Sequence, residues 1–155
     1  MNLSAEESSA RARLYAFYLL KFRNRSQYEI ETKLKEKKYS DGIIEQTIDY
    51  LKKARFIDDR RFARDWIKAR LNKPFGLKRI SFELKHKGVD EEIIQGAVNE
   101  IKDTFLEEAL VLSLAQKQTA KYGNIEPLKV KQRLFGFLSR RGFSMEAIQK
   151  AIQKI

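Results

Sequence analysis

The chain has 155 residues with 32 Lys and Arg against 21 Asp and Glu, a formal charge of +11 that favours a polyanionic partner. It contains no Cys, which excludes disulfides, thiol nucleophiles and Cys-ligated metals and favours the cytoplasm. Because Gly and Pro are few among many helix-forming residues, the composition predicts an all-α protein.

The N-terminal residues are polar and acidic, and no apolar run approaches the roughly 18 residues that a membrane span requires. We therefore expect residues 1–10 to be a flexible segment, and we expect neither secretion nor membrane insertion. A helix is predicted from about Arg11 to Arg23. The sequence from Ser26 to Glu29 fits a capping box, which predicts the start of a second helix.

One pattern of residues occurs three times, beginning at Leu34, Leu84 and Leu138. Each copy ends an apolar helix, passes through a basic turn to a capping Ser or Asp, and enters another apolar helix. The three windows read LKEKKYSDGIIEQTIDYL, LKHKGVDEEIIQGAVNEI and LSRRGFSMEAIQKAIQKI. A further helix precedes each pair, so the pattern predicts an elongated tandem array of three three-helix, helix-turn-helix-like repeats.

The spacing divides the chain into residues 11–54, 55–103 and 104–155, which we call repeats 1, 2 and 3. A unit of about 50 residues has a marginal core by itself, so neighbouring repeats are expected to stack. Gly88 and Gly142 stand where left-handed helix caps are needed. Lys38 holds that place in repeat 1, and we expect its turn to have a different shape.

Helix caps and core residues follow from the same pattern. Asp58 and Asp59 are interpreted as caps of a helix that ends near Asn72, and Thr104 to Glu107 as the capping box of a helix that ends near Lys121. Apolar residues at helical spacing are predicted to be core. They are Leu14, Phe17 and Tyr18 in repeat 1, and Phe62, Trp66, Ile80 and Leu84 in repeat 2.

The residues that carry catalysis or metal binding in other proteins form no convincing cluster. The only His, His86, stands between two lysines. An acid-base or magnesium role for Asp58 and Asp59 fits less well than capping, because neighbours in sequence point in different directions on a helix. We expect a non-enzyme with no metal, cofactor or small-molecule substrate.

Basic residues recur with the repeats, which predicts a long cationic surface that can follow a polyanion or an acidic groove. A solvated charged face without a partner is the plain alternative.

The residues from Phe56 to Arg70, with their double Asp, Phe62-Ala63 and Trp66, resemble the signature of the RecX family. The similarity continues through Gly76 and the segment from Glu83 to Gly88, and covers nearly the whole chain. Ala54-Arg55 departs from the glycine-containing approach that is common in that family, as Lys38 departs from the glycine of the other turns.

This resemblance implies tandem three-helix repeats and a regulator of the bacterial recombinase RecA. Such a regulator lies in the groove of the RecA–DNA filament and inhibits strand exchange, ATP hydrolysis and coprotease action, with no catalysis of its own. By that analogy nine basic residues are candidates for contact with RecA or DNA. They are Arg61, Arg64, Arg70, Lys78, Arg79, Lys85, Lys87, Arg140 and Arg141.

Other functions stay open. A monomer could bind single- or double-stranded DNA directly, but the helices that follow the turns begin with acidic residues such as Asp41 and Glu91, which disfavours sequence-specific reading. A helical adaptor for a protein partner would bind with little dependence on salt.

Overall fold

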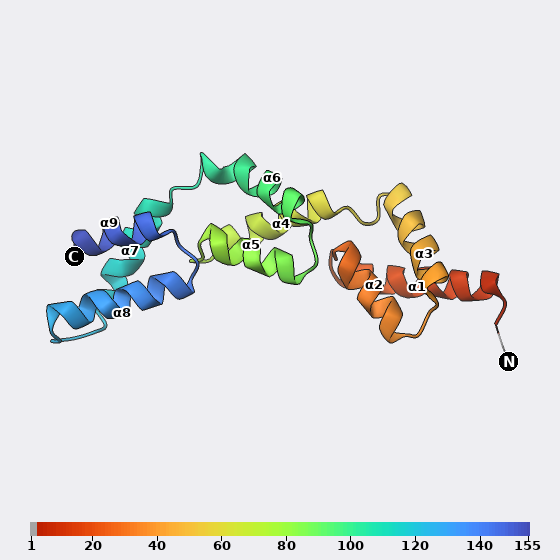
Figure 1. Ribbon diagram of the computed structural model, residues 1–155, viewed down its shortest axis with the longest axis horizontal. Coiled ribbons are helices and arrows are strands. Elements are labelled where there is room, and N and C mark those ends of the chain that lie inside the picture. The colour runs from red at the N-terminus through yellow and green to blue at the C-terminus, as the bar shows by residue number, and fades with distance from the viewer. Residues whose placement is uncertain (1–2) are drawn as a thin grey trace.

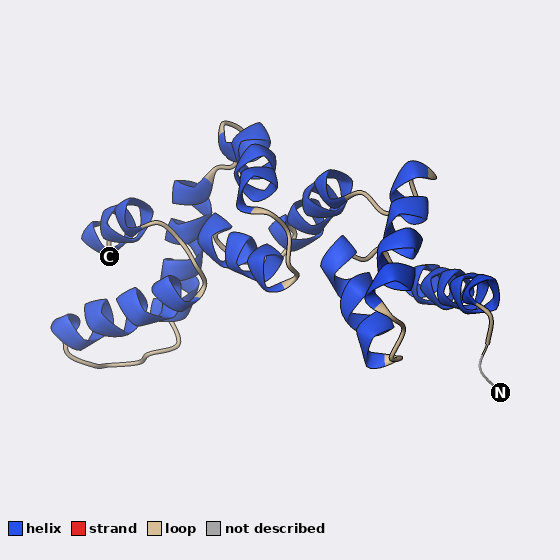
Figure 2. Ribbon diagram, turned by 45° about the vertical axis from the view of Figure 1, so that its right-hand side comes forward, coloured by secondary structure: helices blue, strands red, loops and turns tan. Residues whose placement is uncertain are grey.

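The computed structural model describes residues 3–155, which form nine helices and no strand. The helices come in three groups of three that lie in a row, with the two ends of the chain at opposite ends of that row (Figure 1). The helices are α1 (Ala5–Phe22), α2 (Gln27–Glu36), α3 (Asp41–Lys53), α4 (Asp59–Leu71), α5 (Leu77–His86), α6 (Glu91–Lys102), α7 (Glu107–Thr119), α8 (Pro127–Arg140) and α9 (Met145–Gln153). The predicted all-α tandem array is confirmed (Figure 2). Within residues 3–155, each helix is too short or too polar to cross a membrane.

The first helix begins at Ala5 and not at Arg11, so the expected flexible segment is wrong for residues 5–10. The Ser4 hydroxyl accepts a hydrogen bond from the Glu7 N–H (3.1 Å), and the Glu7 carboxylate accepts one from the Ser4 N–H (3.0 Å). This reciprocal capping box satisfies free donors at the helix start and places acidic side chains there, where the helix dipole favours them. Residues 1–2 of the expected segment lie outside the described residues.

Each group of three helices buries a core of its own. Ile30, Leu34 and Leu51 are fully buried in the first group, Ile80 and Leu84 in the second. The third core contains Val111, Leu134 and Leu138. Helices make most of their contacts within their own group, so the row consists of small cores joined by narrow junctions. The repeat boundaries at 54/55 and 103/104 stay a prediction.

Two of the predicted core residues, Leu14 and Tyr18, lie on the surface, and Trp66 packs against the core of repeat 2 at its edge. Trp66 is only partly buried, because Phe62, Ala63 and Ile67 form the buried side of α4. In α1 the small residues Ala12 and Ala16 are buried with Leu19, which lets that helix pack closely. Leu14 and Tyr18 therefore point outward and are 68% and 58% exposed. Phe17 is partly buried, and Phe62, Ile80 and Leu84 are buried as predicted.

The turn of repeat 1 has the same backbone as the other two, contrary to expectation. The φ angles of Lys38, Gly88 and Gly142 are 61°, 71° and 81°. In each turn the next residue donates to the carbonyl of the leucine five residues earlier, for example Tyr39 N–H to Leu34 (3.3 Å) and Val89 N–H to Leu84 (3.2 Å). Lys38 thus takes a left-handed conformation that costs a residue with a Cβ about 1–2 kcal/mol. Arg55, at φ 59°, does the same after α3.

The predicted capping box from Thr104 to Glu107 does not form. The helix α7 begins only at Glu107, and no side chain caps it. The Glu107 carboxylate instead accepts hydrogen bonds from the N–H (2.9 Å) and the hydroxyl (2.7 Å) of Ser144, which caps α9. The Glu107 carboxylate therefore binds Ser144 within repeat 3 and does not cap α7 in the way that the local sequence had predicted.

Candidate partner-binding surface

A hydrogen bond to a turn carbonyl joins repeat 2 to repeat 1 and repeat 3 to repeat 2. The turn after α5 packs on the start of α2, where the Ser26 hydroxyl donates to the Lys87 carbonyl. The turn after α8 packs on the start of α5, where the Gly76 N–H donates to the Arg141 carbonyl (2.8 Å). Ser26 and Gly76 are the N-caps of α2 and α5. The two junctions therefore use equivalent positions, although their atoms differ.

Both junctions require a residue without a Cβ. A Cβ at Gly88 would overlap the Cβ and Cγ of Tyr28, and one at Gly142 would overlap the backbone of Arg79. The glycines also have the positive φ angles described above. Each glycine consequently ends a helix and lets the next repeat approach closely.

Asp58 and Asp59 have different roles. The Asp58 carboxylate accepts hydrogen bonds from the Arg60 and Arg61 N–H groups (2.9 and 3.1 Å), which confirms Asp58 as the cap of α4. Asp59 was also predicted to be a cap, but its carboxylate crosses the junction and accepts the Gln27 N–H at the start of α2 (2.8 Å). Burial raises the pKa of Asp59, and the hydrogen bond from Gln27 opposes that rise. Asp59 is a residue of the junction.

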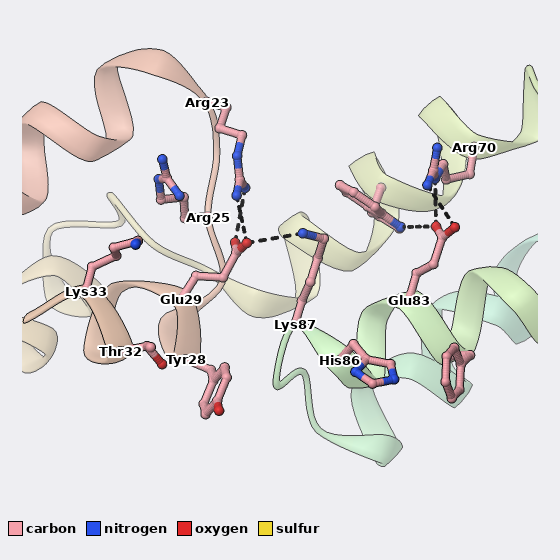
Figure 3. A pocket seen from close by; sticks show the side chains of 12 residues that line it. Arg23, Arg25, Tyr28, Glu29, Thr32, Lys33, Arg70, Glu83, His86 and Lys87 are labelled. Carbon is pink, nitrogen blue, oxygen red and sulfur yellow. Dashed lines mark hydrogen bonds and ion pairs between the residues drawn. The ribbon is translucent and has the colours of Figure 1, made fainter. Parts of the chain in front are cut away.

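A groove of about 570 Å³ lies on the surface where repeats 1 and 2 meet (Figure 3). Its lining combines five cations, two carboxylates and several rings, with six residues from each repeat. The lining residues are Arg23, Arg25, Tyr28, Glu29, Thr32 and Lys33 from repeat 1, and Trp66, Arg70, Phe82, Glu83, His86 and Lys87 from repeat 2.

Glu29 holds the two walls of the groove together. Its carboxylate accepts two hydrogen bonds from Arg23 of repeat 1 (2.7 and 3.1 Å) and one from the Lys87 ammonium of repeat 2 (3.1 Å; Figure 3). Burial alone would raise the pKa of Glu29. The hydrogen bonds from Arg23, the Ser26 N–H and Lys87 outweigh burial and lower that pKa to about 2. Glu29 therefore stays ionised at neutral pH and keeps both cations in place.

Glu83 has a similar role within repeat 2. Its carboxylate accepts hydrogen bonds from the Trp66 indole N–H (3.0 Å) and from Arg70 (2.6 and 2.8 Å). Burial would raise the pKa of Glu83, but the bonds from Arg70 and Trp66 lower it. The Lys87 ammonium lies 4.4 Å from the centre of the Trp66 ring, so cations and rings form one connected network along the groove floor.

The nine candidate basic residues do not form one cluster. Five are engaged in structural contacts: Arg70 and Arg79 with Glu83, Lys87 with Glu29, Arg141 with the Pro74 carbonyl, and Arg61, although its side chain is exposed, with the Arg55 carbonyl. Arg61 and the other four are exposed, and two of those four pair with carboxylates at the surface. The exposed five are Arg61, Arg64, Lys78, Lys85 and Arg140.

Sequence reasoning missed the contribution of repeat 1 to the groove. Tyr28 lies two residues before the buried Ile30, and Phe82 two residues after the buried Ile80. Two residues correspond to about 200° around a helix, so each ring points away from the core stripe. An aromatic residue on the polar side of a helix was the available signal. The convergence of Arg23, Arg25 and Lys33 with repeat 2 depends on the junction and had no such signal.

Models of the RecX family match three successive segments of the chain. The models described as the first, second and third three-helix domains of RecX match residues 12–51, 58–98 and 107–152. These segments coincide with the three groups of helices.

Curated relatives and solved structures agree with these matches. The regulatory protein RecX of Amycolatopsis mediterranei is 34% identical over 91% of this chain and 81% of its own length. That of Chlorobium limicola is 32% identical over 97% and 93%. The crystal structure of RecX from Lactobacillus salivarius has a TM-score of 0.86 at 24% identity, covering 96% of this chain and 97% of that one, and thus shares the fold. The chain belongs to the RecX family of regulatory proteins.

Proposed function

We propose that this chain binds the filament that the recombinase RecA forms on DNA, in the cytoplasm, and inhibits its recombinase, ATPase and coprotease activities without catalysis of its own. Membership of the RecX family supports this function. The observation that carries it is the extended row of three repeats with exposed cations on α4, α5 and α8. A row of this kind can contact several neighbouring subunits of a filament at once.

The charge suits a partner that contains DNA. Arg61 and Arg64 project from α4, Lys78 and Lys85 from α5, and Arg140 from α8. Cations that neutralise phosphates release counterions, so binding is expected to weaken steeply as salt is added. Backbone hydrogen bonds fix the junction of repeats 2 and 3. The helices that carry these cations therefore keep their relative positions, which lowers the entropic cost of binding.

A titration of the purified protein, which we propose to be a monomer, into preformed RecA filaments on single-stranded DNA tests the proposal. ATP hydrolysis is followed, and binding to the same DNA without RecA is measured in parallel. We expect inhibition at protein concentrations well below that of RecA and below those that saturate free DNA. Inhibition that appears only as free DNA saturates would contradict filament recognition.

That second outcome would favour a general DNA-binding protein that acts directly on single- or double-stranded DNA. The net charge of +11 and the cations and exposed rings of the groove are the observations on its side. Both functions predict dependence on salt, so the ratio of protein to RecA at half-inhibition is the measurement that separates them.

A further inference from the structure

The groove between repeats 1 and 2 presents two aromatic rings to solvent. Tyr28 on α2 is 52% exposed and Phe82 on α5 is 61% exposed, and both line the groove. They come from opposite walls, since α2 belongs to repeat 1 and α5 to repeat 2. The Phe82 ring meets His86 edge to face, with ring centres 4.3 Å apart. Exposed rings on both walls of a groove at a junction indicate a contact surface.

Three of the five cations that line the groove are held in place, and two can reorient. Arg23, Arg70 and Lys87 are fixed by Glu29 and Glu83. Arg25 donates to the Leu19 carbonyl through its Nε (3.3 Å), a bond that does not use the two terminal nitrogens of its guanidinium. Within residues 3–155, Lys33 makes an ion pair with the exposed Glu36 alone (2.7 Å), and water screens such a pair strongly. Arg25 and Lys33 can therefore turn toward an anion in the groove.

We propose that this groove binds an unpaired nucleotide of single-stranded DNA, with its base stacked on Tyr28 or Phe82 and its phosphate near Arg25 and Lys33. Stacking on aromatic rings beside cations is how proteins hold single strands without reading sequence. A duplex hides the faces of its bases, and an acidic peptide would use the cations but leave the rings bare. The volume of about 570 Å³ lies within the range of about 300–1,000 Å³ that is common for small-ligand sites.

The single tryptophan of the chain provides the measurement, because Trp66 lines the same groove. The full chain is titrated with oligothymidylate and with an oligomer of the same length that has abasic sugars in place of nucleosides. We expect oligothymidylate to change Trp66 fluorescence and to bind about fivefold or more tightly than the abasic oligomer.

Phe82→Leu tests the ring itself and keeps an exposed apolar side chain at that position. We expect it to weaken oligothymidylate binding about fivefold or more and to leave abasic binding unchanged. Tyr28→Leu is the second variant, with circular dichroism to check the junction at Gly88. Phe135→Leu is the matched control, because Phe135 is an exposed ring on α8, outside the groove.

Equal binding of both oligomers would show that charge alone attracts DNA and would overturn the proposal. So would losses in both Phe82→Leu and Tyr28→Leu that are no larger than the loss in Phe135→Leu. An oligoglutamate that changes Trp66 fluorescence as strongly as oligothymidylate would assign the groove to acidic peptides instead. Because RecA is absent from these titrations, a negative result leaves filament inhibition to its own test.

Discussion

Gly88 combines a left-handed backbone with close packing on Tyr28. We expect Gly88→Ala to lower the free energy of unfolding by about 2–4 kcal/mol, from backbone strain and overpacking together. Urea unfolding followed by Trp66 fluorescence measures the loss. Gly96→Ala is the matched control: Gly96 lies inside α6 with open space around it, so alanine there should stabilise by up to about 1 kcal/mol. Equal effects at the two positions would contradict the role assigned to Gly88.

Glu29 makes the junction of repeats 1 and 2 sensitive to acid. Its pKa is about 2 against an ordinary value of 4.5, so its stabilisation is fully present above pH 4.5 and is lost as the pH falls toward 2. We expect Glu29→Gln to cost about 1–2 kcal/mol at pH 7, with allowance for partial solvent screening, and much less near pH 2.

Thermal unfolding at several pH values, compared between Glu29→Gln and the parent chain, measures this difference. The comparison removes the contribution of Asp59, whose pKa burial raises and which therefore acts in the opposite direction. Glu45→Gln, on the exposed side of α3, is the control. A loss in Glu29→Gln that is the same at every pH would argue against the ion pairs as its cause.

At the scale of the helix, α4 has one side buried in the core of repeat 2 and an opposite side exposed to solvent. Phe62, Ala63 and Ile67 are buried, whereas Arg61 and Arg64 are exposed. We expect the double change Arg61→Glu and Arg64→Glu to weaken inhibition of RecA at least tenfold while the circular dichroism spectrum stays unchanged.

Lys35→Glu with Lys53→Glu in repeat 1 alters the net charge by the same amount and serves as the control. If this pair weakened inhibition as much as the changes on α4, overall charge would explain the effect and α4 would have no special place. Unchanged inhibition in the α4 variant would remove that helix from the proposed surface.

Local patterns predicted the helices well, because apolar residues at i and i+4 mark a buried side wherever a core lies on one side only. Leu14 and Tyr18 were misplaced because alanines at 12 and 16 are the residues that α1 buries. The caps at Ser26 and Asp58 could be predicted, since they depend on neighbouring residues. The links made by Asp59 and Glu107 could not, because their partners are distant in sequence.

The groove could not be predicted either, because the residues that line it are also distant in sequence. Its walls come from helices about 50 residues apart, and they meet only because the Gly88 turn packs on the start of α2. The recurrence of basic residues with the repeats was visible in the sequence, but it did not distinguish cations in structural ion pairs, such as Arg70, from exposed ones, such as Lys78.

For the whole molecule, we expect the number of repeats to determine how strongly the chain inhibits RecA. Deleting residues 104–155 removes repeat 3 with its own core and leaves the contacts between repeats 1 and 2 intact. We expect this truncation to reduce inhibition of RecA by at least tenfold, because a row that contacts several subunits gains from each linked contact. Circular dichroism of the fragment verifies that the first six helices remain folded. If the fragment inhibited RecA nearly as well as the full chain does, the row would not act through linked contacts.

The turn at Lys38 has a consequence for self-assembly. It has the backbone of the Gly88 and Gly142 turns, which pack on the helix start of a preceding repeat. Lys38 has a Cβ where those turns have none, so we expect the turn of repeat 1 not to pack as closely on a second copy of the chain. Repeats that join head to tail could otherwise polymerise without limit. We therefore expect the row not to extend head to tail through this turn.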